Sequence, residues 1–167
     1  MVQSLLSAIL GTVLVLAPFA SIPTASIQPL QVADAKGVER TICTTFSINE
    51  KLMYWGTAAH CVLEKEGEGA LEGAVHVRAV RIGGHATKIV LVNAQLDIAV
   101  LQAEVSAPAI PLGKRPVLGD EVRVYGYMWG AFSPTLFKGT VANLNIEADG
   151  QHFVLFDMRV GGGHSGS

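Results

Sequence analysis

Short apolar runs separated by turn-forming residues follow one another along this chain from Val38 onward. The clearest alternation lies in residues 74–82, where Val75 and Val77 fall on one side of an extended strand and His76 falls on the other. Runs of this kind predict strands at 41–47, 52–55, 74–82, 87–92, 98–101, 122–127, 136–141 and 153–160. Apart from a turn near residues 58–63, no stretch has a helical period. Such closely spaced strands predict an all-β barrel or sandwich.

A segment with two prolines, residues 107–113, is predicted to link two halves of the chain. The first half, residues 34–106, holds most of the predicted strands, and the second half, residues 107–167, holds only three. Residues 64–73, which are rich in Glu and Gly, are predicted to form a solvated and flexible loop.

The first 33 residues carry no charged side chain, and residues 5–20 form a run composed mostly of Leu, Ile, Val and Ala. A secretory signal has an apolar region of roughly 7 to 15 residues, whereas a membrane-spanning helix needs about 20. The run is slightly long for a signal peptide and short for a membrane-spanning helix. No positive charge precedes it and no clean cleavage site follows it, so the sequence does not distinguish the two. Residues 1–33 are therefore interpreted as a signal peptide or a membrane anchor, with a packed segment as the remaining alternative.

The net charge of −2, from 12 Lys and Arg against 14 Asp and Glu, includes no basic run. A nucleic-acid-binding protein needs a basic patch that neutralises phosphates, so no nucleic-acid partner is expected. The two cysteines, Cys43 and Cys61, have 17 residues between them. They are either buried thiols or a disulfide, and two are too few for a structural zinc site. The histidines show no metal-ligand spacing, so no metal or cofactor is expected.

Three local motifs bear residues that are suited to chemistry. His60 lies in Thr-Ala-Ala-His-Cys, Asp97 opens the apolar run Asp-Ile-Ala-Val-Leu, and Ser165 lies in Gly-Gly-Gly-His-Ser-Gly-Ser. Alone, each has an ordinary structural interpretation: a satisfied histidine, a turn-capping carboxylate and a flexible loop. Together, they offer a base, a carboxylate that orients it, and a hydroxyl in a loop whose glycines let the backbone turn sharply and aim its N–H groups at one point.

These motifs, in this order, resemble those of the trypsin/chymotrypsin-like serine peptidases, and specifically of their HtrA-like branch. The resemblance covers residues 38–167, and it includes Gly119–Gly126 and Gly139–Val141 as strands of the second barrel. It implies two six-stranded antiparallel β-barrels of the chymotrypsin type. It also implies that His60 is the general base, Asp97 the orienting carboxylate and Ser165 the nucleophile, as in the triad known for this family.

The resemblance has further implications for the site. The backbone N–H groups of Gly163 and Ser165 would form the oxyanion hole, and Cys43–Cys61 would be the disulfide that ties the histidine-bearing turn to the preceding strand. A disulfide agrees with an exported protein, whether periplasmic, extracellular or anchored to the envelope. The substrate would be a polypeptide, cleaved through an acyl-enzyme without metal or cofactor.

The sequence departs from the family pattern in two places. His164 stands where Asn or Asp usually precedes the nucleophile, and the sequence given ends two residues after Ser165, before the strands that close the second barrel in the family. The second barrel is therefore expected to be incomplete, and the 167 residues alone are expected to have little peptidase activity. Two other hypotheses remain: a catalytically silent protease-fold binding module, and an envelope protein tethered to the membrane through residues 1–33.

Overall fold

The computed structural model describes residues 24–33, 37–65, 75–128, 131, 133–148, 150–159, 162 and 164–167. Their elements are η1 (Thr24–Ser26), β1 (Ile27–Ala33), β2 (Glu39–Asn49), β3 (Tyr54–Thr57), η2 (Ala59–Cys61), β4 (Leu63–Lys65), β5 (Val75–Val77), β6 (Arg81–Ile82), β7 (His85–Asn93), β8 (Ile98–Ala103), β9 (Glu121–Gly126), β10 (Thr135–Ala148) and β11 (Gln151–Asp157). The helical elements in this described part are single 3-10 turns, so the prediction of an all-β protein is confirmed.

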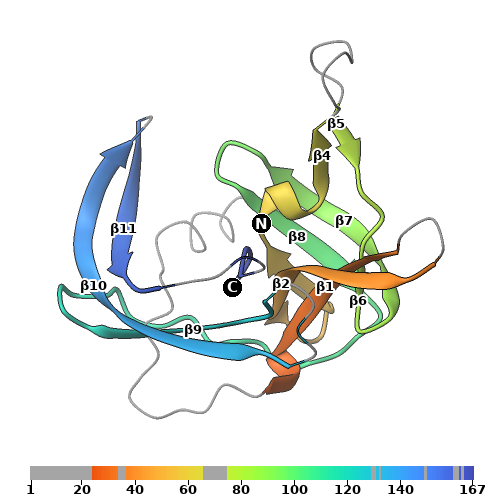
Figure 1. Cartoon of the computed structure of the whole chain (residues 1–167), viewed down its shortest axis with the longest axis horizontal. Helices are drawn as coiled ribbons and strands as arrows, with labels where there is room; N and C mark the ends of the chain where they lie inside the picture. Colours follow the sequence, from red (N-terminus) through yellow and green to blue (C-terminus); the bar gives the residue numbers. More distant parts are fainter. Residues whose placement is uncertain are drawn as a thin grey trace. The chain divides into compact units, whose positions relative to one another are not determined.

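Six strands close into an antiparallel barrel in the order β1-β2-β3-β8-β7-β6 (Figure 1). Leu30, Trp55, Ile82 and Leu101 come from four of these strands, and their side chains are almost wholly buried. The indole N–H of Trp55 donates to the carbonyl of Val105 at 3.2 Å, so its polar atom is satisfied inside the core. Burial of these side chains removes apolar surface from water and makes the barrel a rigid support for the loops at its ends.

Strand β1 begins at Ile27, inside the range 1–33 that was predicted to lie apart from the first barrel half. Ile27 and Leu30 are buried, whereas Gln28 and Gln31 are partly exposed but neutral. A barrel strand of this kind needs no charge, which explains why it could not be told from the uncharged segment before it. The signal-peptide or membrane-anchor prediction now rests on residues 1–23, which lie outside the described residues. Over the part that the structure describes, no helix is long and apolar enough to cross a membrane.

The predicted strand 74–82 is divided in the structure. β5 pairs with β4 in a separate two-stranded sheet, and β6 belongs to the barrel. Between them the backbone N–H of Arg78 donates to the carbonyl of Val62 at 2.9 Å, and Val80 turns into the core with 4% of its surface exposed. The alternating residues of this segment therefore belong to two different sheets, with β5 in the two-stranded sheet and β6 in the barrel. Most of the predicted loop 64–73 lies outside the described residues.

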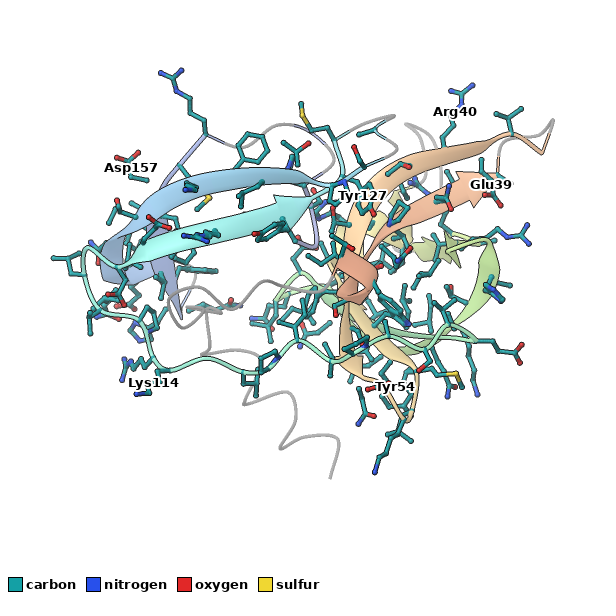
Figure 2. All side chains as sticks on the ribbon, turned by 90° about the horizontal axis from the view of Figure 1, so that it is seen from below. Glu39, Arg40, Tyr54, Lys114, Tyr127 and Asp157 are labelled. Atoms are coloured by element: carbon teal, nitrogen blue, oxygen red, sulfur yellow. A yellow bond between two sulfur atoms is a disulfide. The ribbon has the colours of Figure 1, made fainter. Side chains whose placement is uncertain are left out.

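An ion pair on the first barrel joins β2 to β6. Glu39 and Arg40 lie at the beginning of β2 (Figure 2), and a carboxylate oxygen of Glu39 is 3.3 Å from Nε of Arg81. Both side chains of this ion pair are substantially exposed, so the pair contributes little to stability.

The chain divides into two compact units. Of the described residues, 24–110, 125–135, 162 and 164–167 belong to the unit that contains the closed barrel, and 111–124 with 136–159 belong to the other. Strands β9, β10 and β11 form a three-stranded sheet in the order β11-β10-β9. β10 and β11 pair from Ala148 and Gln151 at the hairpin turn to Thr140 and Asp157. The described residues thus contain one closed barrel and a partial second sheet.

Candidate active site

Asp97 is placed by the hairpin between β7 and β8. The side-chain oxygen of Asn93 accepts a hydrogen bond from the backbone N–H of Leu96 at 2.9 Å, which stabilises the turn. Asp97 itself has a φ of 51°, in the left-handed region, where Asp occurs more readily than most residues. This backbone conformation sets the direction of the carboxylate just before β8 begins.

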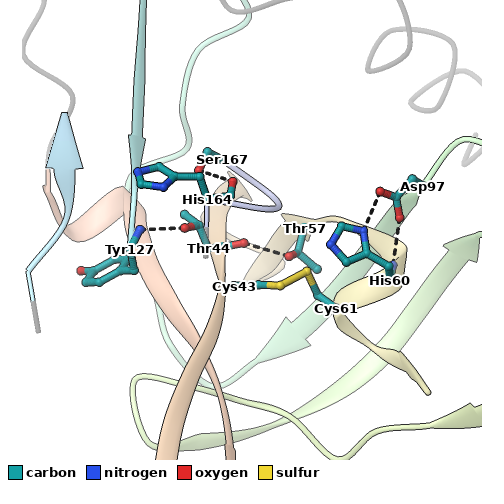
Figure 3. Close-up of a disulfide and its surroundings, with 9 residues drawn as sticks. All are labelled: Cys43, Thr44, Thr57, His60, Cys61, Asp97, Tyr127, His164 and Ser167. Atoms are coloured by element: carbon teal, nitrogen blue, oxygen red, sulfur yellow. Dashed lines mark hydrogen bonds and ion pairs between the residues drawn. A yellow bond between two sulfur atoms is a disulfide. The ribbon is translucent and has the colours of Figure 1, made fainter. Parts of the chain in front are cut away.

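His60 lies in the 3-10 turn η2, immediately after β3. Since β3 pairs with β8, with Thr57 opposite Ala99, the turn that follows β3 lies beside the turn that precedes β8. Sheet register therefore brings His60 and Asp97 together across 37 positions of sequence. The backbone N–H of His60 donates to Oδ1 of Asp97 at 2.9 Å, and Nδ1 of His60 lies 2.7 Å from Oδ2 (Figure 3). Their side chains are 56% and 51% exposed.

The predicted disulfide between Cys43 and Cys61 is confirmed, with an S–S distance of 2.01 Å. It joins β2 to η2, so the residue next to His60 is covalently attached to the neighbouring strand (Figure 3). Donor atoms of Cys43, Cys61 and His60 lie within 4.8 Å of one another. Because the two sulfurs are bonded to each other, neither is a thiolate that could bind a metal in this state.

Ser165 lies in a tight turn formed by residues 164–167. The N–H and the hydroxyl of Ser167 both donate to the carbonyl of His164, at 2.9 and 2.6 Å. Gly166 has a φ of +83°, a conformation that L side chains rarely adopt. The carbonyl of Ser165 accepts a hydrogen bond from the backbone N–H of Thr44 at 2.8 Å, which attaches the turn to β2. Gly163, the other residue predicted for an oxyanion hole, lies outside the described residues.

Gly166 shows how closely this turn packs against the barrel. A Cβ added there would collide with the carbonyl oxygen of Thr44 and the hydroxyl of Thr57, and it would lie 3.0 Å from the backbone nitrogen of Ala58. The turn that bears Ser165 therefore lies directly on the segment that leads to His60. The structure thus brings His60 and Asp97 into contact, and it attaches the Ser165 turn to Thr44, the residue after Cys43.

Sequence reasoning did not identify the polar residues that surround this turn. The hydroxyl of Thr57 donates to the carbonyl of Thr44 at 2.8 Å, and the backbone N–H of Tyr127 donates to Oγ1 of Thr44 at 2.8 Å (Figure 3). Thr44 is wholly buried, and Tyr127 and His164 are 7% exposed. Burial raises the pKa of the Tyr127 phenol above its usual value. The only signal in the sequence was a pair of threonines in an apolar strand beside Cys43.

The closed antiparallel barrel, the contact between His60 and Asp97, and the turn with Gly166 at positive φ agree with the resemblance inferred from the motifs. The model of the trypsin-like peptidase domain family matches residues 43–167, and the chain belongs to this family. The resemblance inferred from the motifs is therefore confirmed. None of the curated proteins matches the sequence.

Solved structures with the same fold include Deg5 and two proteases. Deg5 is 16% identical with a TM-score of 0.60, over 86% of this chain and 72% of Deg5. The serine endoprotease from Yersinia pestis is 18% identical with a TM-score of 0.59, over 86% of this chain and 48% of that one. The HtrA-type protease AlgW, solved with a decapeptide, is 18% identical with a TM-score of 0.62, over 85% of this chain and 51% of AlgW. The chain thus spans about half the length of the last two, and at these identities the likeness establishes the fold.

Proposed function

We propose that this chain contains the peptidase domain of an exported serine endopeptidase, in which His60, Asp97 and Ser165 form the catalytic triad. The observation that carries the proposal is the pair of hydrogen bonds from His60 to the two carboxylate oxygens of Asp97. A carboxylate accepts hydrogen bonds and does not donate them, so in the neutral imidazole this contact places the proton on Nδ1 and the lone pair on Nε2. This is the tautomer that a general base for a serine hydroxyl requires.

The mechanism follows the roles known for this family. Nε2 of His60 takes the proton of the Ser165 hydroxyl as the oxygen attacks the carbonyl carbon of a peptide bond. Asp97 holds the imidazole and stabilises the imidazolium that forms. His60 then gives the proton to the leaving amine, and a water molecule, activated in the same way, hydrolyses the acyl-enzyme. Side chains and water supply every proton and nucleophile in this sequence of steps.

The oxyanion of the tetrahedral intermediate would be stabilised by the backbone N–H groups of Gly163 and Ser165. The two hydrogen bonds that the His164 carbonyl accepts from Ser167 support this role, because that carbonyl shares a peptide plane with the Ser165 N–H and so restrains its direction. A donor that is already oriented needs no reorganisation when negative charge develops, which is the basis of its catalytic effect.

Residues 107–167 are proposed to be the second half of a chymotrypsin-type double barrel, with β9, β10 and β11 as part of its sheet. Residues 34–106, together with β1, make the first half. The buried Cys43–Cys61 disulfide supports export, because disulfides persist in oxidising compartments. The substrate class is polypeptide, since the chain belongs to a peptidase family.

Labelling of the chain with a fluorophosphonate tests the triad. We expect one covalent adduct, located on Ser165 by peptide mapping, and its loss in both Ser165→Ala and His60→Ala. Ser133→Ala, which removes an exposed hydroxyl from a loop of the same unit, should leave the labelling unchanged. A protein that is folded by circular dichroism yet takes up no label would contradict an assembled triad in this chain and would favour the binding-module alternative.

A further inference from the structure

Thr44 occupies the point where strand β3 stops pairing with β2. The ladder between these strands pairs Asn49 with Tyr54, Ser47 with Trp55 and Phe46 with Gly56, and β3 ends at Thr57 as the chain turns into η2. The peptide groups of Thr44 bond instead to two other partners. Its N–H donates to the carbonyl of Ser165, and its carbonyl accepts from the hydroxyl of Thr57, both at 2.8 Å.

The side chain of Thr44 makes a third connection, in a different direction. Its Oγ1 accepts a hydrogen bond from the backbone N–H of Tyr127 at 2.8 Å, which attaches the residue that follows β9 to β2 (Figure 3). Thr44 and Tyr127 are 83 positions apart in sequence, and the bond between them is buried. A buried N–H that loses its acceptor is costly, so this hydroxyl determines where the backbone at Tyr127 can lie.

The turn that bears Ser165 is in close contact with both of the segments that Thr44 connects. Gly166 packs against Thr44 and Thr57 so tightly that a Cβ would not fit. At Gly126, just before Tyr127, a Cβ would collide with Oγ of Ser167 and would lie 2.8 Å from the His164 ring and 2.9 Å from the Thr44 hydroxyl oxygen. The turn 164–167 therefore has β2 and the end of β3 on one side and the Gly126–Tyr127 backbone on another.

We propose that Thr44 is a positioning residue for the nucleophile turn: its peptide group holds the turn, and its hydroxyl holds the neighbouring backbone against which the turn packs. This role rests on the proposed function of Ser165 as nucleophile. Loss of the hydroxyl releases the Tyr127 N–H, so the Gly126–Tyr127 backbone shifts and the turn 164–167 shifts with it. Because reaction rates depend steeply on the placement of reacting atoms, a shift of this kind lowers the reactivity of Ser165.

The test compares three variants. Thr44→Val removes the hydroxyl and preserves the shape, whereas Thr44→Ser keeps the hydroxyl. Thr45→Val is the matched control, because Thr45 is equally buried on β2 but its hydroxyl donates to the carbonyl of Gln28 on β1, at 3.0 Å. We expect the second-order rate constant for fluorophosphonate labelling of Ser165 to fall at least ten-fold in Thr44→Val. It should stay within about three-fold of wild type in Thr44→Ser and in Thr45→Val.

Hydrogen exchange supplies a second readout that needs no chemistry at Ser165. In Thr44→Val, the amides of Tyr127 and of residue 44 should exchange at least ten-fold faster, whereas Thr45→Val should leave both unchanged. If wild type is labelled and Thr44→Val is labelled at the same rate as Thr45→Val, the positioning role is overturned and the proposed function stays intact. If wild type takes up no label but the two amides respond as stated, the proposed function fails and the structural coupling stands. If neither amide responds, the coupling itself is wrong.

Discussion

His60 donates two hydrogen bonds to Asp97, one from its backbone N–H to Oδ1 at 2.9 Å and one at its ring Nδ1 to Oδ2 at 2.7 Å. The carboxylate thus restrains the main chain and the ring of the same residue. Rotation of the imidazole about its side-chain bonds would break one of these contacts while the other holds the backbone in place. This arrangement suits a base that must present Nε2 in a fixed direction although its side chain is 56% exposed.

Asp97→Asn should slow the labelling of Ser165 by a large factor, and about 10⁴-fold is the loss known for the equivalent change in this family of triads. The side-chain NH₂ of Asn cannot accept a hydrogen bond from Nδ1–H. The imidazole therefore carries its proton on Nε2, where it cannot act as the base. Asn tolerates the left-handed backbone at this position, so the fold should persist. Labelling kinetics and a thermal melt measure the two effects. The exposed Asp157→Asn serves as a control, and unchanged labelling in Asp97→Asn would contradict the triad.

Gly166→Ala should reduce labelling of Ser165 by roughly 100-fold, because the added Cβ meets the Thr44 carbonyl and the Thr57 hydroxyl and displaces the turn. Gly84→Ala is the matched control, since Gly84 has a φ of +80° and a Cβ added there would meet no atoms within 4 Å. Both substitutions incur the left-handed penalty of about 1–2 kcal/mol, but only the first creates a collision. Equal labelling in the two variants would show that packing at Gly166 does not control the nucleophile.

The double variant Cys43→Ala/Cys61→Ala should lower the free energy of unfolding by about 3 kcal/mol, because the cross-link between positions 18 apart restricts the unfolded chain. For a chain of this size the melting temperature should fall by roughly 6–12 °C. Urea and thermal unfolding measure these changes. Wild type in excess dithiol reductant should approach the variant, which should itself be insensitive to reductant. A wild type that is equally stable with and without reductant would contradict this contribution.

Tyr127→Phe should change how stability depends on pH above neutrality. Burial raises the pKa of the Tyr127 phenol, so the native protein keeps this proton at a pH where an unfolded tyrosine, with a pKa of about 10, releases it. The contribution of Tyr127 to stability is therefore complete below about pH 10 and is lost as pH rises toward the native pKa. Urea unfolding from pH 8 to 11 should show a shallower alkaline decline in Tyr127→Phe than in wild type. Tyr54→Phe, which retains Tyr127, should behave like wild type, and identical slopes in all three proteins would refute the prediction.

Several features of the fold were predictable because they depend on local sequence. The series of short strands identified an all-β protein, and the motifs around His60, Asp97 and Ser165 identified the peptidase family. The beginning of the barrel was not predictable, because the strand with buried Ile27 and Leu30 carries no charge and directly continues the uncharged N-terminal segment. The break between β5 and β6 was also missed, because alternation does not reveal which sheet a strand joins.

The sequence by itself determined which chemical groups this protein carries and which family it belongs to, since both depend on residue types and their order along the chain. Only the tertiary structure decided which of those groups meet. The contact between His60 and Asp97 depends on the register of β3 against β8, and the proposed role of Thr44 depends on β3 ending where the turn of residues 164–167 packs. Strand periodicity is a local property, whereas register and strand ends are set by the closure of the whole barrel.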